Sequence, residues 1–180
     1  ITIKDNKVTI NEIVTKGQNI HYKGSDEKAG AVVLSKGIKI TPAEIGVLAS
    51  VGKSVVKVKV NPNICTIATG NELVEVDQLP EPHQIRKSNM LTIEAALLNS
   101  KIPSSSLHLL DDKESIKTAL EKALIKNDVL LLSGGVSKGK FDFIPDVMES
   151  LGVEKVFHRV AQRPGKPFWF GLHAKLKTVV

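Results

Sequence analysis

The first third of the chain carries short stretches in which β-branched residues alternate with polar ones. They occupy residues 7–14, 19–22 and 31–34 and are separated by glycines, a pattern typical of short strands joined by turns. We therefore expect a small β-rich lobe at the start of the chain.

A helix and one further strand are expected next. In the segment 41–52, Thr41 suits the N-cap, the following residue is a proline, and Glu44 completes a capping box. Residues 54–60 then alternate like a strand with one solvated face. An Asn-Pro pair breaks this pattern, and we place a domain boundary there.

From residue 63 onward, apolar strands alternate with amphipathic helices. Residues 64–69 form a continuous apolar run, and the apolar positions of 111–127 recur at the spacing of one helix face. Strands are expected at 64–69, 105–110, 128–133, 154–160 and 168–171, and helices at 87–100, 111–127 and 144–152. The alternation predicts the α/β class, with a parallel-majority sheet covered by helices on both faces.

These patterns divide the chain into three parts. We expect a partial β-rich domain over 1–40, a linking helix and strand over 41–62, and an α/β domain over 63–180. Because the chain opens and stops within strand-like patterns, we expect it to be a piece of a longer polypeptide.

The composition favours a soluble, cytoplasmic protein. Hydrophobic residues make up 42% of the chain and charged residues 24%, as in ordinary globular proteins. Neither a run of roughly 20 apolar residues nor the apolar core of a signal peptide occurs, so no membrane partner is expected. Cys65 is the single cysteine, which excludes an internal disulfide and argues against a zinc site of the Cys/His type.

The net charge of +6 raises the question of a polyanionic partner. The lysines are spread along the chain, and one Trp, one Tyr and five Phe leave few rings to stack on bases. A small anionic ligand accounts for the charge equally well, and we expect no nucleic-acid partner.

Polar and glycine-rich residues gather where four of the expected strands end. Ligands bind beyond the carboxyl ends of the strands in open α/β sheets, so a site is expected at these exits. The four segments are TGNEL (69–73), LLDD (109–112), SGGVSKGKFD (133–142) and RPGKP (163–167).

The third segment combines glycines with hydroxyl groups. Gly134 and Gly135 lack a Cβ and allow positive φ, so backbone N–H groups there can approach an anion such as phosphate. An ordinary strand-to-helix turn is the alternative interpretation. Ser133 and Ser137 add hydroxyl donors, but the Gly-x-Ser-x-Gly pattern of a serine hydrolase is absent.

Acids follow three of the strand exits. Glu72 and Asp142 can hold Mg²⁺ or act as general bases, and the alternative is that each caps a helix or faces water. One of Asp111 and Asp112 is expected to cap the next helix, which leaves the other free to face a ligand.

The last exit places two cations in a stiff loop. Arg163 and Lys166 flank a Pro-Gly pair, and a second proline follows. Arg offers a bidentate fork and Lys a point charge, and both suit an anionic ligand. A solvated turn is the alternative.

Five motifs together resemble the molybdopterin molybdenumtransferase family, whose animal member is the E domain of gephyrin. The motifs are ATGNELV, QIRKSNMLTIEAAL, LLDDKESIKTAL, LLLSGGVSKGKFDFIPDV and FHRVAQRPGKPFWFG. They cover residues 63–171 in the family's order, and the segment 18–52 resembles the β-rich part that precedes them in the family.

The resemblance implies that the full protein inserts molybdate into adenylylated molybdopterin and releases AMP, with a divalent cation, usually Mg²⁺. It implies catalytic roles for Glu72, Asp142 and Lys166, of which the two acids are also metal ligands. It implies substrate contacts for Thr69, Gly70, Ser88, Asn89, Asp111, Asp112, Ser133, Gly134, Gly135, Val136, Ser137, Arg163, Pro164 and Gly165. It also implies a homodimer in which a neighbour's β-rich lobe completes the site, and this piece alone is expected to be inactive.

The sequence departs from the family pattern at three positions. Asn71 stands where the family has an aspartate, Lys138 where it has a valine, and Arg163 where it has a lysine. The first change replaces a carboxylate by an amide, so weaker cation binding is expected. Two alternatives therefore stay open: nucleotide transfer like that of a molybdopterin adenylyltransferase, and a non-catalytic dimerisation or scaffold module.

Overall fold

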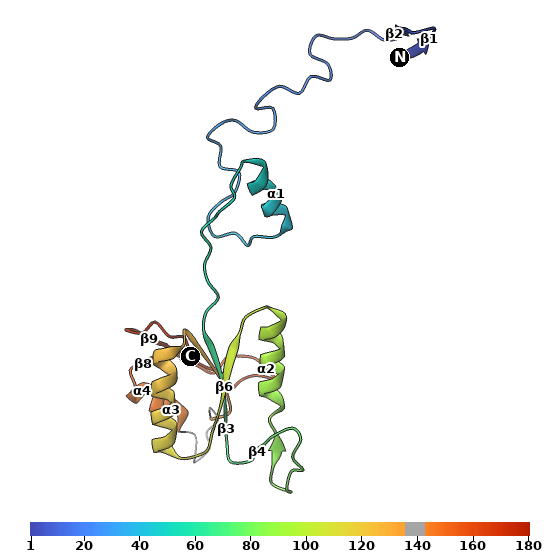
Figure 1. Cartoon of the computed structure of the whole chain (residues 1–180). Coiled ribbons are helices and arrows are strands. Elements are labelled where there is room, and N and C mark those ends of the chain that lie inside the picture. Colours follow the sequence, from blue (N-terminus) through green and yellow to red (C-terminus); the bar gives the residue numbers. More distant parts are fainter. Residues whose placement is uncertain (136–142) are drawn as a thin grey trace. The chain divides into compact units, whose positions relative to one another are not determined.

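The computed structural model of the protein describes residues 1–135 and 143–180. The chain divides into two compact units, Ile1–Val58 and Lys59–Val180 (Figure 1). None of the described helices is both long enough and apolar enough to cross a membrane.

The first unit contains one antiparallel ribbon. Strands β1 (Thr2–Lys4) and β2 (Lys7–Thr9) pair through a two-residue turn. Asp5 and Asn6 have φ values of 50° and 58° in that turn, and two positive values are characteristic of a tight hairpin.

Other strands expected in this part of the chain do not form. Residues 19–22, 31–34 and 54–60 have no strand, and the strand expected at 7–14 is shortened to Lys7–Thr9. These expectations were wrong because alternation gives a segment only a preference for extended backbone. A stable strand also needs a partner and a buried face, and every residue from 1 to 58 is exposed or half-buried.

Helix α1 (Pro42–Ser50) begins with the capping box that the sequence predicts. The Ala43 N–H donates to Thr41 Oγ1 at 3.3 Å, and the Thr41 N–H donates to the Glu44 carboxylate at 2.8 Å. The hydrogen bond from the Thr41 hydroxyl lowers the pKa of Glu44. The helix ends before Gly52, whose φ of +74° reverses the chain.

The second unit is built around a parallel sheet with the strand order β6-β3-β7. The central strand β3 (Ile64–Thr69) lies between β6 (Ser104–Leu109) and β7 (Val129–Ser133). All six residues of β3 are buried, which explains why the strand carries no charged residue and is mostly apolar. The predicted α/β class is confirmed.

Helices cover both faces of this sheet (Figure 1). α2 (Ser88–Asn99) lies on one face, and α3 (Lys113–Lys126) and α4 (Ile144–Ser150) lie on the other. α3 buries four apolar side chains at helical spacing, as its periodicity predicts: Ile116, Leu120, Ala123 and Leu124.

The last two strands depart from a simple run of parallel neighbours. β8 (Val153–His158) pairs antiparallel with β9 (Trp169–His173) rather than with β7. Val179 connects this ribbon to the sheet by bridging to Val129 in β7 and to Leu172 in β9. These pairings give β8 the direction of β7 but place it three strand spacings away, about 14 Å.

Candidate functional site

The exits of β3 and β7 meet the start of α2 around a pocket of about 140 Å³. Six of the site residues expected from the sequence line it: Thr69, Glu72, Ser88, Asn89, Ser133 and Gly134. They come from segments as much as 65 positions apart in the sequence, and the parallel pairing of β3 with β7 brings them together. We refer to this space as the exit pocket.

The glycines after β7 are required by a close backbone approach to β3. Gly134 has a φ of +103°, and a Cβ on it would lie 2.6 Å from Thr69 Oγ1 and 2.8 Å from the Thr69 carbonyl oxygen. A Cβ on Gly135 would lie 2.5 Å from Ile144 Cγ1. A side chain at Gly134 would push the exit of β7 away from β3, and one at Gly135 would press against α4.

Thr69 carries a hydroxyl with no hydrogen-bond partner among the described residues. The residue is only 5% exposed. A buried polar group without a partner is costly, and structures that keep one often use it to bind something. Because Thr69 lines the exit pocket, this hydroxyl is a candidate for a ligand contact.

The start of α2 supplies further donors. Lys87 is the N-cap residue and makes no capping hydrogen bond through its side chain, so the first N–H groups of the helix have no side-chain acceptor there. The N-terminal end of a helix carries partial positive charge and suits an anion. Asn89 Nδ2 donates to Ser133 Oγ at 3.2 Å, which joins α2 to the exit of β7.

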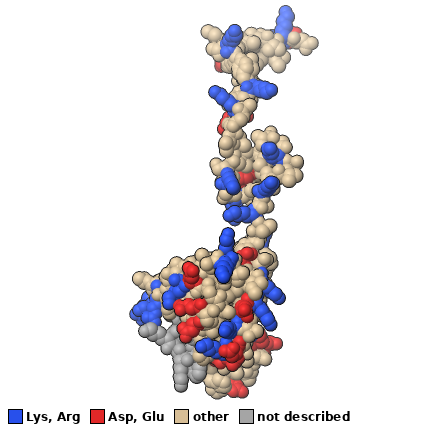
Figure 2. All heavy atoms as spheres, turned by 90° about the vertical axis from the view of Figure 1, so that its left-hand side faces the viewer, with Lys and Arg blue, Asp and Glu red and all other residues tan. Residues whose placement is uncertain are grey.

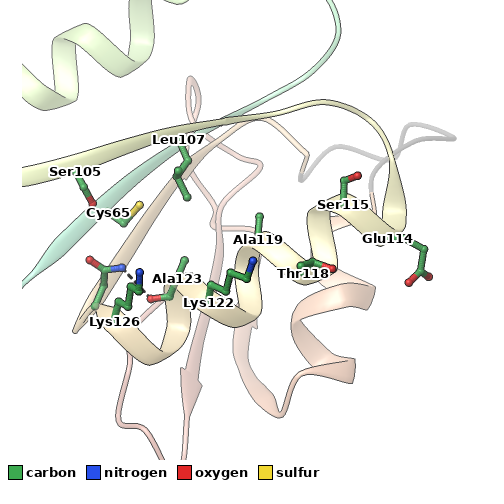
Figure 3. Close-up of a pocket in the computed structure, with 11 residues that line it drawn as sticks. Cys65, Ser105, Leu107, Glu114, Ser115, Thr118, Ala119, Lys122, Ala123 and Lys126 are labelled. Atoms are coloured by element: carbon green, nitrogen blue, oxygen red, sulfur yellow. Dashed lines mark hydrogen bonds between the residues drawn. The ribbon is translucent and has the colours of Figure 1, made fainter.

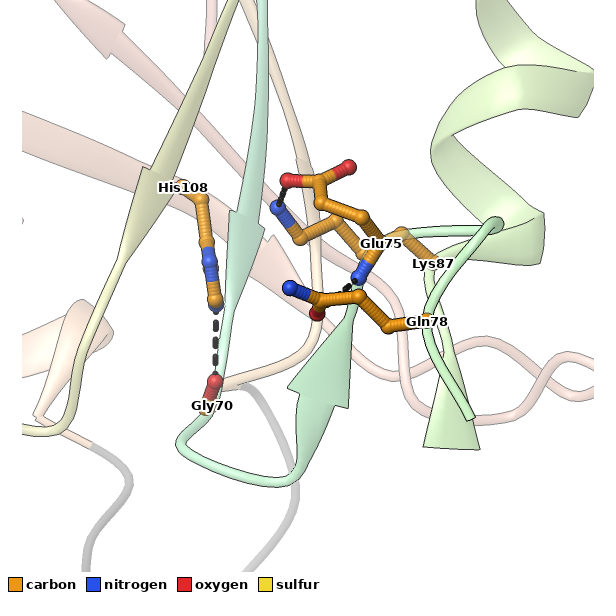
Figure 4. Close-up of polar contacts among 5 residues, drawn as sticks. All are labelled: Gly70, Glu75, Gln78, Lys87 and His108. Atoms are coloured by element: carbon orange, nitrogen blue, oxygen red, sulfur yellow. Dashed lines mark hydrogen bonds and ion pairs between the residues drawn. The ribbon is translucent and has the colours of Figure 1, made fainter. Parts of the chain in front are cut away.

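The turn after β3 is tied to β6 and to the segment that follows β6 by four hydrogen bonds. The Gly70 N–H donates to the Leu109 carbonyl at 3.1 Å, and His108 Nε2 lies 2.8 Å from the Gly70 carbonyl oxygen (Figure 4). The Asp111 N–H donates to Asn71 Oδ1 at 3.0 Å, and the Asn71 N–H donates to Asp111 Oδ2 at 3.4 Å. We call these four bonds the β6 contacts.

The two aspartates after β6 have different partners. Asp112 caps α3 by accepting from the Ser115 N–H at 2.8 Å, and its hydrogen bonds with Ser115 lower its pKa. Asp111 is engaged with Asn71 instead. The sequence thus predicted a cap at this place, and the structure identifies which acid provides it. Ligand contacts of either acid stay a prediction.

Replacing Asp112 by alanine should lower the melting temperature by a few degrees at neutral pH, because α3 loses its cap. Since the pKa of Asp112 is depressed in the folded protein, its contribution is present above the ordinary value of 3.8 and disappears as the pH falls through the folded value. Melting curves of both proteins from neutral to acidic pH should therefore converge in acid. Asp77→Ala, at an exposed loop position, is the control. A difference that persists at low pH would contradict the assignment of the cap.

The basic loop lies on the turn between β8 and β9. Arg163, Pro164, Gly165 and Lys166 are exposed and do not line the exit pocket. The backbone of this turn closes through a bond from the Val160 N–H to the Lys166 carbonyl, at 3.2 Å. β8 is displaced from β7 because β9 and Val179 lie between them.

Part of the expected site falls outside the described residues. Val136, Ser137 and Asp142 belong to the segment 136–142, of which the structure gives no description. Within the described ranges, no group of three or more His, Cys, Asp or Glu side chains is arranged to hold a metal ion.

Two residues near the site were missed by the sequence interpretation. His108 holds the Gly70 carbonyl, and Lys87 lines the exit pocket while pairing with Glu75 (Figure 4). Lys87 is the main cause of the lowered pKa of Glu75. The alternating pattern of β6 could have placed His108 on one face of the strand. It could not have identified Gly70 as its partner, because Gly70 belongs to another segment of the chain.

Two larger pockets lie beside β6. One, of about 780 Å³, is lined by α3 and includes Cys65, Leu107 and Ala119 (Figure 3). Another, of about 750 Å³, lies on the α2 side and includes Glu94 and His108. Neither is lined by any of the site residues expected from the sequence, so we place the candidate site in the smaller exit pocket.

Charged side chains are intermixed on the face shown in Figure 2. Lys and Arg lie among Asp and Glu over the second unit on this face. This agrees with the scattered lysines of the sequence.

Comparisons with known proteins agree with this arrangement. The family described as "Probable molybdopterin binding domain" matches residues 65–180, and the "MoeA N-terminal region (domain I and II)" matches residues 2–52. The molybdopterin molybdenumtransferase of Synechocystis sp. is 43% identical over 183 residues, covering 100% of this chain and 47% of that protein. A Staphylococcus aureus protein of the same name is 38% identical over 159 residues, covering 87% and 38%.

A solved structure shares the fold. The molybdopterin biosynthesis moea protein from Pyrococcus horikosii superposes with a TM-score of 0.66 at 33% identity, covering 84% of this chain and 37% of that one. The chain thus spans about half or less of the length of these relatives. On the match over residues 65–180, which include the exit pocket, the chain belongs to the molybdopterin-binding domain family.

Proposed function

We propose that the protein of which this chain is a part inserts molybdate into adenylylated molybdopterin and releases AMP, in the biosynthesis of the molybdenum cofactor. The names of its relatives support this reaction, as does the family match over the second unit. The observation that carries the proposal is the exit pocket, where the Thr69 hydroxyl, which has no partner among the described residues, meets the start of α2 and the Asn89–Ser133 pair.

These groups suit the phosphates of a nucleotide-bearing pterin. N–H and hydroxyl donors bind phosphate oxygens with charge-assisted hydrogen bonds, which are stronger than neutral ones. Thr69, Ser88, Asn89, Ser133 and Gly134 would provide them. Further substrate contacts are proposed for Gly70, Asp111, Asp112, Gly135, Val136, Ser137, Arg163, Pro164 and Gly165.

Catalytic roles are proposed for Glu72, Asp142 and Lys166. Mg²⁺ favours one or two carboxylates together with phosphate oxygens, and Glu72 lines the exit pocket, so it fits this requirement. Glu72 and Asp142 would hold the cation, which neutralises charge on the phosphates. Lys166 would add a cation from the turn between β8 and β9.

The wider setting of the chain is also a proposal. We propose a partial β-rich domain over 1–40, a link over 41–62 and a molybdopterin-binding domain over 63–180. We further propose that the full protein is a cytoplasmic homodimer and that this chain alone does not catalyse the reaction.

Thr69→Val in the full-length protein tests the proposed site. Valine keeps the shape of threonine and removes the hydroxyl, so the affinity for adenylylated molybdopterin should fall about tenfold or more. The melting temperature of the ligand-free protein should stay the same or rise, because the buried hydroxyl that is lost has no partner among the described residues. Titration calorimetry and thermal melting measure the two effects.

Thr92→Val is the matched control. Thr92 is exposed on α2 and donates to the Ser88 carbonyl within its own helix, so its loss should leave ligand affinity unchanged. Wild-type affinity in Thr69→Val would exclude the exit pocket as the phosphate site.

A further inference from the structure

His108 is placed to control the turn that leads from β3 to Glu72. It comes from β6, and its Nε2 lies 2.8 Å from the carbonyl oxygen of Gly70 (Figure 4). A carbonyl oxygen can only accept, so Nε2 carries the hydrogen. A neutral imidazole with its hydrogen on Nε2 can make this bond, and so can the charged ring, which carries a hydrogen on both nitrogens.

The other β6 contacts hold the same turn. The Gly70 N–H donates to Leu109, and Asn71 exchanges two hydrogen bonds with Asp111. His108 provides the remaining contact, the one to the Gly70 carbonyl. That carbonyl belongs to the peptide plane joining Gly70 to Asn71, which His108 holds at the carbonyl and Asp111 holds through the longer bond from the Asn71 N–H.

The orientation of this plane bears directly on Glu72. The Glu72 carboxylate folds back over Gly70, where a Cβ would lie only 2.3 Å from Glu72 Oε2. Gly70 has a φ of +131°, a conformation that other residues rarely adopt. A rotation of the Gly70–Asn71 peptide would therefore move the carboxylate relative to the exit pocket that Glu72 lines.

We propose that His108 is a positioning residue that holds the Gly70–Asn71 turn so that the Glu72 carboxylate stays aimed at the ligand. The inference rests on the proposed function, because it takes Glu72 to act on the bound ligand. His108 itself does not line the exit pocket. Its effect on the reaction therefore passes through Glu72.

A double-mutant cycle in the full-length enzyme tests this role. His108→Phe keeps an aromatic ring and loses the N–H, and it should lower kcat for molybdenum insertion up to about tenfold, with KM within about twofold. His108→Gln restores an N–H donor of similar reach and should recover most of the rate. On a Glu72→Gln background, His108→Phe should change kcat by less than about twofold, because the carboxylate it positions is gone.

The outcomes separate the inference from the proposed function. Suppose that Glu72→Gln is slow. A wild-type rate in His108→Phe would then overturn the positioning role alone, and so would a double variant in which the two effects on kcat multiply. A wild-type rate in Glu72→Gln would overturn the proposed role of Glu72 and this inference with it. Melting temperatures check the fold of each variant, and His108→Leu takes the place of His108→Phe in the cycle if the phenylalanine does not fit.

Discussion

Gly134→Ala should lower the free energy of unfolding by about 4 kcal/mol. The φ of +103° alone costs an alanine about 2 kcal/mol. The new Cβ would in addition lie 2.8 Å from the Thr69 carbonyl oxygen, a backbone atom at the end of the central strand that is held in place by the pairing of β3 with β6. Overpacking of this kind adds about 1–3 kcal/mol.

Gly165→Ala separates the two contributions. Gly165 has a φ of +102°, which matches that of Gly134, but its nearest neighbour would be the Gln162 side chain at an ordinary 3.5 Å. The control should therefore lose only the conformational part, about 2 kcal/mol. Urea denaturation of the three proteins measures both values. Equal losses in the two variants would show that β7's exit has room for a side chain.

Leu120→Ala should cost about 3–5 kcal/mol, because it opens a cavity in the centre of the core. Leu120 is 0% exposed in α3 and belongs to the cluster that joins α3, α4 and the sheet. Truncation removes the transfer free energy of the lost carbons and leaves their neighbours without contacts.

Ile125→Ala is the matched control in the same helix. It deletes the same number of carbon atoms, but Ile125 is 68% exposed, so its cost should stay below about 1 kcal/mol. Both variants are compared by denaturant midpoint at constant m-value. Similar losses for the two would contradict the orientation of α3 on the sheet.

Local sequence signals predicted the helices and the central strand well. The periodicity of α3 identified its buried face, and the apolar run of β3 identified a strand covered on both sides. The cap of α1 was predicted down to Thr41 and Glu44. Each of these features depends on residues within one or two turns of each other.

Features that depend on distant partners were predicted less well. The strands expected at 19–22 and 31–34 have the right composition but no partner or buried face. The pairing of β8 with β9, and its attachment through Val179, follows from contacts that no local pattern encodes. The same holds for His108, whose bond joins residues 38 positions apart.

The role of the glycines after β7 could be predicted only in part from the sequence. Their presence at a strand exit predicted a close approach, but the sequence could not say whether a ligand or the chain itself would approach. The structure shows that Thr69 and Ile144 occupy that space, so the glycines serve packing whatever they do for a ligand.

The central position of β3 has a consequence for how the protein is made. Of the three parallel strands, β3 is synthesised first. Its pairing with β7 joins residues that lie 65 positions apart in the sequence. At about 5–20 residues per second, a ribosome needs roughly 3–13 s to add those residues. Until β6 has been made β3 lacks both of its neighbours, and until β7 has been made it still lacks one, so its six residues, all buried in the folded protein, stay exposed in the nascent chain. This makes the nascent chain a target for chaperones that bind exposed strands.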